Sequence, residues 1–197
     1  MGEQERILLM INRWGYLNTE QLGLLVNKKK RATEELLKTL HKKGLIKFDQ
    51  HTYRNIYYLS HKGNTFVGRE HKKAIKINCY EMPHQDILIK WLVAQTDIEH
   101  YQTERELKIE NGNLKESPHL LIEIINNKNV LIECERTRKA KTRYKRIFDS
   151  MVSYLKQDYE CWWIVPNQAM AKFINERIKE ENWRVEQHKV ILFNYIV

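Results

Sequence analysis

The order of helical and β-type patterns in the first 70 residues is the feature that most restricts the fold of this chain. Residues 3–14 and 28–43 place apolar side chains at helical spacing, and a shorter helical stretch lies between them. Two β-rich runs follow, 45–48 and 53–59, and the four residues between them are typical of a hairpin turn. Residues 60–70 again favour a helix. Three helices, a hairpin and a final helix predict a winged helix-turn-helix domain.

Capping residues predict where these helices begin and end. Gly15 is expected to end the first helix. Asn18 begins the second, and Gln21 three residues later completes the pattern of a capping box. Asn27 is expected to begin the third helix, and Gly44 to end it.

The expected third helix opens with a run of basic residues. Its first turn is Lys28, Lys29, Lys30 and Arg31, and we expect Thr33 on the exposed face. A recognition helix presents its N-terminal residues to the major groove, where cations contact guanine edges or phosphates. Cations at this end of a helix oppose its dipole, so an anionic partner would offset a cost. The alternative is a solvated helix start without a partner.

The positive charge is concentrated in the same part of the chain. Of the net charge of +9, residues 1–83 carry +8, from 16 Lys and Arg against 8 Asp and Glu. Residues 84–197 carry +1. Such asymmetry indicates a polyanionic partner for the first half, and we expect double-stranded DNA. Tyr53 and Arg54, in the hairpin, are predicted to reach the DNA backbone or the minor groove.

No membrane partner is expected. The longest apolar window falls well short of the roughly 18 residues that span a bilayer. The N-terminus also lacks the basic region and cleavage site of a signal peptide, which predicts a cytoplasmic protein.

The second half is expected to form a small α/β domain. Residues 71–83 have little pattern and are expected to connect a domain at 1–70 to another at 84–197. The order α-β-β-β-α-β predicts a mixed sheet with helices on its faces. The expected elements are helix 84–96, strands 98–107, 120–125 and 130–135, helix 136–156, strand 161–165, helix 168–180 and short strands 183–186 and 190–195.

Two carboxylates carry the clearest chemical signal of this half. Glu133 and Glu135 are two residues apart on an expected strand, so both side chains point to one face of the sheet. Oxygen ligands of this kind suit Mg²⁺ at sites that act on phosphates. Seven of the next eleven residues are basic, and Arg138, Lys141 and Arg143 among them are candidate DNA contacts. The alternative is structural, with the carboxylates salt-bridged to the basic helix.

The sequence resembles the replication-relaxation family, which includes C-class mobilisation relaxases of plasmids. The resemblance is carried by Thr103-Glu104-Arg105-Glu106-Leu107, Pro118-His119, Ile132-Glu133-Cys134-Glu135-Arg136-Thr137, Lys139 and Arg143-Tyr144. It implies a winged helix joined to a domain similar to PD-(D/E)xK nucleases, with DNA and other relaxosome or replication proteins as partners. Glu133, Glu135 and Glu104 would be acidic active-site residues, and Lys139 or Lys141 the cation near the scissile phosphate.

The chain departs from the nuclease pattern at one position. Where that pattern has Pro-Asp, this sequence has Pro118-His119. The candidate metal ligands are therefore Glu133, Glu135 and His119, and imidazole is a poorer ligand for Mg²⁺ than carboxylate. Mg²⁺ or Mn²⁺ would serve nicking and would not be required for DNA binding. A degenerate core without catalysis is equally compatible with the sequence.

Three functions follow from these observations. The first is a DNA-binding protein of plasmid or mobile-element processing, with or without metal-dependent nicking. The second is a winged-helix transcriptional regulator that binds as a homodimer, its inactive C-terminal domain serving dimerisation or partner binding. The third is an interaction protein that recruits or blocks a nucleic-acid enzyme without reading sequence. Metal-dependent nicking would indicate the first function, a palindromic footprint the second, and binding without sequence preference the third.

Overall fold

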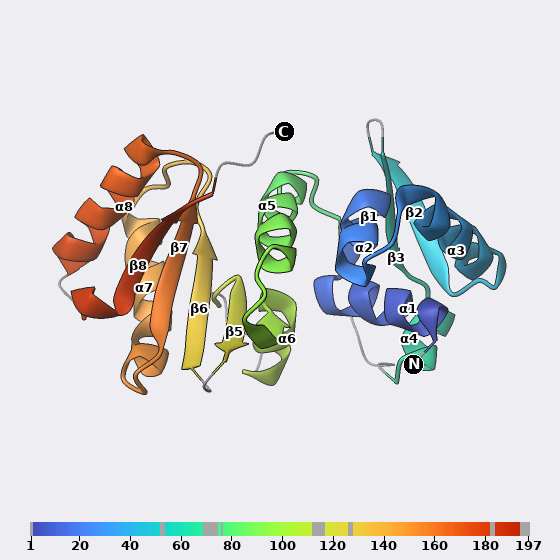
Figure 1. Ribbon diagram of the computed structural model, residues 1–197, viewed down its shortest axis with the longest axis horizontal. Coiled ribbons are helices and arrows are strands. Elements are labelled where there is room, and N and C mark those ends of the chain that lie inside the picture. The colour runs from blue at the N-terminus through green and yellow to red at the C-terminus, as the bar shows by residue number, and fades with distance from the viewer. Residues whose placement is uncertain are drawn as a thin grey trace. The chain divides into compact units, whose positions relative to one another are not determined.

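The chain folds into two compact units that both combine helices with a β-sheet (Figure 1). The structure is a computed structural model, and it describes residues 2–51, 54–68, 75, 77–111, 117–125, 128–181 and 184–193. Unit 1 spans Met1–Val93 and unit 2 spans Ala94–Val197. Helix α5 (Met82–Val93) therefore groups with unit 1, whereas the sequence places the domain boundary before it, at 71–83. A mixed α and β architecture was expected and is confirmed.

Unit 1 follows the expected order of three helices, a hairpin and a helix. Its three strands form one antiparallel sheet in the order β1-β3-β2, in which Phe48 lies opposite Tyr57. Strand β1 was not expected from the sequence. The elements are α1 (Glu3–Trp14), β1 (Tyr16–Asn18), α2 (Thr19–Val26), α3 (Lys30–Lys42), β2 (Ile46–His51), β3 (Arg54–Leu59), α4 (His61–Phe66) and then α5.

The capping residues account for most helix boundaries of unit 1. The capping box is confirmed: the backbone N–H of Gln21 donates to Asn18 Oδ1, and that of Asn18 donates to Gln21 Oε1, both at 2.9 Å. The role predicted for Asn27 is wrong, because Asn27 adopts a left-handed conformation and ends α2. Helix α3 consequently begins two residues later than expected, at Lys30, after Lys29 as its N-cap.

The buried face of α3 includes a residue that was expected to be exposed. Thr33, predicted to face DNA, is fully buried, and its hydroxyl donates to the Lys29 carbonyl at 3.2 Å. Leu37 and Leu40 pack on the same buried side, with side chains 1% and 0% exposed. Thr33 is therefore a core residue, and the prediction that it contacts DNA is wrong.

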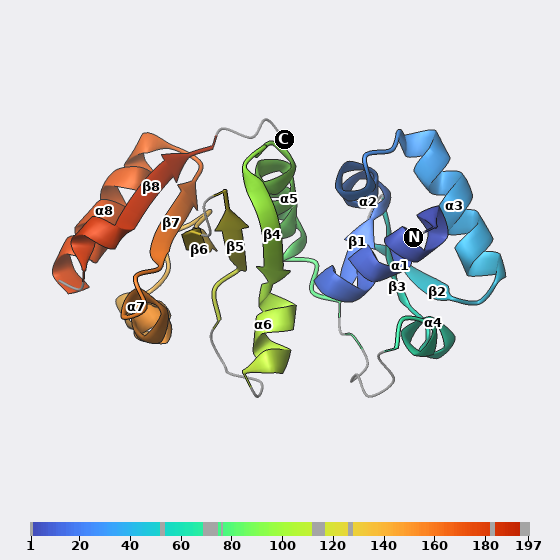
Figure 2. The same cartoon turned by 60° about the horizontal axis from the view of Figure 1, so that its bottom comes forward.

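Unit 2 is built on a five-stranded mixed sheet (Figure 2). Its strand order is β4-β5-β6-β7-β8, antiparallel from β4 to β6 and parallel from β6 to β8. The elements are β4 (Ile98–Thr103), α6 (Glu104–Glu110), β5 (Leu120–Ile124), β6 (Lys128–Cys134), α7 (Lys141–Leu155), β7 (Glu160–Val165), α8 (Gln168–Glu181), a 3₁₀ turn (Val185–Gln187) and β8 (His188–Leu192).

Helices α7 and α8 cover one face of this sheet. Leu131 of β6 and Trp163 of β7 form a buried cluster with Tyr144 and Met151 of α7 and Ile174 of α8. Because side chains alternate along a strand, Glu133 follows Leu131 on the same face. Strand β6 thus directs Glu133 toward the face of the sheet that α7 covers.

Three predicted boundaries of unit 2 are wrong. The strand expected over 98–107 ends at Thr103, whose hydroxyl caps α6 while the Glu106 carboxylate accepts the Thr103 N–H at 2.9 Å. The helix expected from Arg136 begins only at Lys141, after Ala140 as its N-cap. The pairing with β7 continues as far as Glu135, whose N–H donates to the Ile164 carbonyl at 2.9 Å. Residues 185–187 form a 3₁₀ turn instead of a strand. Within the described residues, no helix is both long and apolar enough to cross a membrane.

Candidate functional site

The basic run at the start of α3 divides into one paired cation and three exposed ones. Lys28 lies before the helix, is partly buried and forms an ion pair with Glu3 of α1. Lys29, Lys30 and Arg31 are exposed at the N-cap and in the first turn. Within the described part of the chain none of these three side chains forms an ion pair, and the first turn of α3 has no acidic residue. Three cations without an ion pair among the described residues are thus exposed at one helix end.

The hairpin contributes less free charge than the sequence suggested. Tyr53 lies outside the described residues. Arg54 is 58% exposed, but its Nη1 lies 3.6 Å from a Glu20 carboxylate oxygen and 3.9 Å from one of Asp86. Asp86 also accepts a hydrogen bond from Gln21 Nε2 at 2.7 Å. Burial raises the pKa of Asp86, and Gln21 and Arg54 oppose this shift.

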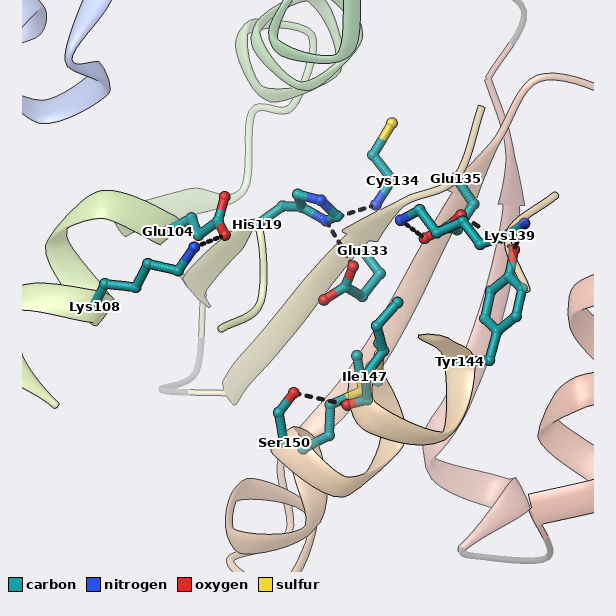
Figure 3. Close-up of polar contacts among 12 residues, drawn as sticks. Glu104, Lys108, His119, Glu133, Cys134, Glu135, Lys139, Tyr144, Ile147 and Ser150 are labelled. Carbon is teal, nitrogen blue, oxygen red and sulfur yellow. Dashed lines mark hydrogen bonds and ion pairs between the residues drawn. The ribbon is translucent and has the colours of Figure 1, made fainter. Parts of the chain in front are cut away.

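Unit 2 brings the predicted acidic residues together in one cluster, in which Glu133 and Glu135 are buried and Glu104 is partly exposed (Figure 3). Glu133 and Glu135 are 2% and 0% exposed. His119 Nδ1 lies 2.6 Å from Glu133 Oε2 and 3.2 Å from the backbone nitrogen of Cys134. A protonated nitrogen cannot accept a hydrogen bond, so the shorter contact assigns Nδ1 as the donor to Glu133. Burial lowers the pKa of His119, but the Glu133 carboxylate outweighs burial and the net shift is upward.

Glu135 is held by two partners. Lys139 Nζ lies 2.6 Å from Glu135 Oε1, and the Tyr144 hydroxyl donates to Oε2 at 3.2 Å. Burial raises the pKa of Glu135, while the ammonium of Lys139 lowers it. Burial and the neighbouring Glu135 raise the pKa of Tyr144, so this hydroxyl stays protonated. Tyr144 therefore serves the cluster as a hydrogen-bond donor.

Glu104 and His119 come together through a main-chain contact. The N–H of Glu104, the first residue of α6, donates to the His119 carbonyl at 2.9 Å. The Glu104 side chain points toward the His119 ring in Figure 3 and forms an ion pair with Lys108. The cluster thus unites four segments, from α6, the start of β5, β6 and the stretch before α7.

Two of the three basic residues predicted to bind DNA in unit 2, Arg138 and Lys141, have partners on α8. The Arg138 guanidinium lies over the Phe173 ring, 4.8 Å from its centroid. Lys141 Nζ lies 3.1 Å from a carboxylate oxygen of Glu180. Arg143 is partly exposed in the first turn of α7. Arg138 and Lys141 therefore contact α8, whereas the structural alternative paired the basic helix with Glu133 and Glu135.

The donor set of the cluster does not suit a divalent metal. Each carboxylate already has a basic side chain as its neighbour: His119 for Glu133, Lys139 for Glu135 and Lys108 for Glu104. Among the described residues, no group of three or more His, Cys, Asp or Glu side chains is arranged to hold a metal ion. A divalent ion would have to compete with these side chains, and with the Tyr144 hydroxyl that donates to Glu135, for the carboxylate oxygens.

Sequence reasoning missed two members of the cluster. Lys108 lies four residues after Glu104, which is ion-pair spacing on a helix, but Glu104 was expected in a strand over 98–107. The sequence offered Tyr144 only through the resemblance at Arg143-Tyr144, and its hydroxyl contact with Glu135 depends on tertiary packing that has no local sequence signal.

Comparisons with known proteins assign no family. No protein-family model matches the chain, and no curated protein matches its sequence. Among solved structures, RV1404 from Mycobacterium tuberculosis is 21% identical with a TM-score of 0.33, over 58% of this chain and 74% of that one. TrmBL2, an archaeal chromatin protein that binds DNA, is 13% identical with a TM-score of 0.29, over 100% and 74%. Human N-acetylserotonin methyltransferase is 11% identical with a TM-score of 0.23, over 96% and 62%. Scores at this level establish no common fold.

Proposed function

We propose that this chain binds double-stranded DNA through unit 1, which acts as a winged helix-turn-helix domain with α3 as its recognition helix. The observation that carries the proposal is the exposed, unpaired group of Lys29, Lys30 and Arg31 at the start of α3. Its support is the order of helices and hairpin in unit 1 together with the charge of +8 on residues 1–83.

The physical basis is attraction to phosphate. The first N–H groups of a helix have no partner within the helix, and its dipole makes this end positive. Three adjacent cations at the same end increase the positive potential, and no carboxylate in the first turn of α3 reduces it. A phosphodiester backbone gains hydrogen bonds and releases counterions at such a site.

Salt-dependent binding to duplex DNA tests the proposal. The slope of log K against log salt should fall by about three when Lys29, Lys30 and Arg31 are all replaced by Ala, with an affinity loss of more than about tenfold. The matched control replaces Arg138, Lys141 and Arg143 by Ala, which also removes three charges. An equal loss in both variants would contradict the assignment of α3.

For unit 2 we propose a PD-(D/E)xK-like fold whose acidic cluster serves protein assembly or partner binding. The sequence resemblance to the replication-relaxation family and the meeting of Glu104, His119, Glu133 and Glu135 support the fold. The neutralised carboxylates argue against metal-assisted nicking. A role in plasmid or mobile-element DNA processing remains a prediction from the resemblance.

A nicking assay separates the alternatives for unit 2. Supercoiled plasmid is incubated with the protein in Mg²⁺, Mn²⁺ or EDTA, beside the Glu133→Ala/Glu135→Ala variant. We expect retarded but intact plasmid in every lane. Metal-dependent open circles with the wild-type protein alone would restore the nuclease hypothesis, and a palindromic footprint would favour a homodimeric regulator.

A further inference from the structure

A groove of about 560 Å³ lies between α3 and the β2-β3 hairpin of unit 1. One stripe of α3 forms its wall, because residues 30, 34, 37, 38 and 41 share a helix face. The hairpin forms its floor through Phe48 and Gln50 of β2 and Asn55 and Tyr57 of β3. The volume lies in the range of small-molecule pockets.

The floor of the groove presents an aromatic surface. Phe48 lies opposite Tyr57 across the hairpin, with ring centroids 5.8 Å apart, and His41 meets Phe48 edge-on at 5.1 Å. Phe48 is 41% exposed although its neighbours hold it from two sides. A supported ring with an open face is the arrangement on which nucleobases stack.

Polar groups surround these rings. Gln50 and Asn55 lie opposite each other, two residues beyond Phe48 and Tyr57 along the hairpin, and their side chains form no hydrogen bond within the described part of the chain. Amides can pair with the edge of a base, and the Glu34 carboxylate on the wall can accept from an exocyclic amino group.

The cations of the wall suit a phosphate attached to that base. Lys30 forms no ion pair within the described residues, and Lys38 forms only an exposed one with Glu35. They lie two helical turns apart on the groove side of α3. An apolar peptide would leave these charges and amides without partners, whereas a nucleotide uses rings, amides and cations together.

We propose that this groove binds an unpaired nucleotide of a DNA strand that extends from the duplex held by α3. The proposal rests on the proposed function of unit 1. The base stacks on Phe48, and Lys30 contacts its phosphate. Unit 1 would then prefer duplex next to a single strand over uninterrupted duplex.

Binding of labelled DNA to the full chain tests the groove. The probes are a blunt 20-bp duplex, the same duplex with a four-nucleotide single-stranded extension at the 3′ or the 5′ end, and duplexes whose extensions are abasic. We expect one natural extension to tighten binding about tenfold and the abasic one to add little, because base stacking supplies the gain. Phe48→Ala should abolish the gain without changing affinity for blunt duplex. Phe66→Ala is the matched control, since Phe66 on α4 is 61% exposed and does not line the groove.

Each outcome separates this proposal from the function on which it rests. Failure to bind any duplex overturns the proposed function. Blunt-duplex binding with no gain from either natural extension overturns only the groove proposal. An equal gain from abasic extensions, or a Phe48→Ala variant that loses affinity for blunt and extended probes alike, also overturns it, because the groove would then hold duplex backbone alone.

Discussion

Two basic segments of this chain look alike in sequence and differ in structure. Residues 28–31 precede and begin α3, and residues 136–146 lead into α7. In the first segment only Lys28 has an ion-pair partner within the described residues. In the second, Lys139 pairs with Glu135, Lys141 pairs with Glu180 and Arg138 lies over Phe173.

The difference teaches that a count of cations does not give the charge available to a ligand. Whether a cation can bind a ligand depends on the carboxylates that the fold brings near it. Residues 84–197 carry nearly as many acidic as basic residues, which agrees with such pairing. A cation that is held by a buried carboxylate would have to leave it unpaired in order to bind phosphate, which costs several kcal/mol. Lys29, Lys30 and Arg31 carry no such cost.

The largest expected effect on stability comes from removing the cation of the buried pair. Lys139→Met should lower the free energy of unfolding by about 3 kcal/mol, because Glu135 is left fully buried without a cation. Lys141→Met is the control: its pair with Glu180 is 72% and 41% exposed, and such pairs contribute about 0–1 kcal/mol. Urea unfolding measures both. Similar losses of stability in the two variants would show that the Lys139–Glu135 pair contributes no more than the exposed Lys141–Glu180 pair.

A smaller effect on stability tests whether His119 occupies the position beside Glu133 that a metal ion would otherwise take. His119→Asp puts a second carboxylate beside Glu133, which should cost about 2 kcal/mol through repulsion and burial. The melting temperature of this variant should then rise with Mn²⁺, while that of the wild-type protein stays unchanged. His119→Asn, which adds no charge, should not respond to Mn²⁺. A rise in the wild-type protein would contradict the neutralised cluster.

The smallest effect separates buried from exposed positions on α3. Thr33→Val keeps the side-chain shape and removes the hydrogen bond to the Lys29 carbonyl, so it should cost about 1 kcal/mol of stability. Its affinity for duplex DNA should equal that of the wild-type protein. Lys30→Ala should do the reverse, weakening binding and leaving stability unchanged. A loss of affinity in Thr33→Val with stability intact would return Thr33 to the DNA interface.

Local patterns predicted the parts of the structure that depend on local interactions. Asn18 and Gln21 satisfy each other's backbone groups within one turn, and strand alternation alone places Glu133 and Glu135 on one face. The prediction for Asn27 was wrong because asparagine is common both at the start of helices and in the left-handed conformation that ends them. That one choice moved the expected start of α3 by two residues. Thr33 was misplaced separately, because it shares the buried face of Leu37 and Leu40, four and seven residues later.

The partners in the acidic cluster could not be predicted, because they depend on contacts distant in sequence. His119 meets Glu133 across neighbouring strands, and Tyr144 reaches Glu135 from the covering helix. Glu104 was read as a strand residue since the β-like residues before it extend the pattern, whereas the Thr103 cap begins a helix. Lys108 could be recognised as the partner of Glu104 only once the helix placed them four residues apart on one face.

Arg54 gives the hairpin a thermodynamic connection to proton binding. It contacts Asp86, a carboxyl of α5 whose pKa burial has already raised, and α5 is the last element before the chain enters unit 2. A phosphate that draws Arg54 away removes a cation that favours the ionised carboxyl, so the pKa of Asp86 rises further and proton uptake accompanies binding. By reciprocity, protonation of Asp86 weakens its contact with Arg54 and makes Arg54 available to an anion. A lower pH and a bound anion therefore both favour the state in which Arg54 has left Asp86.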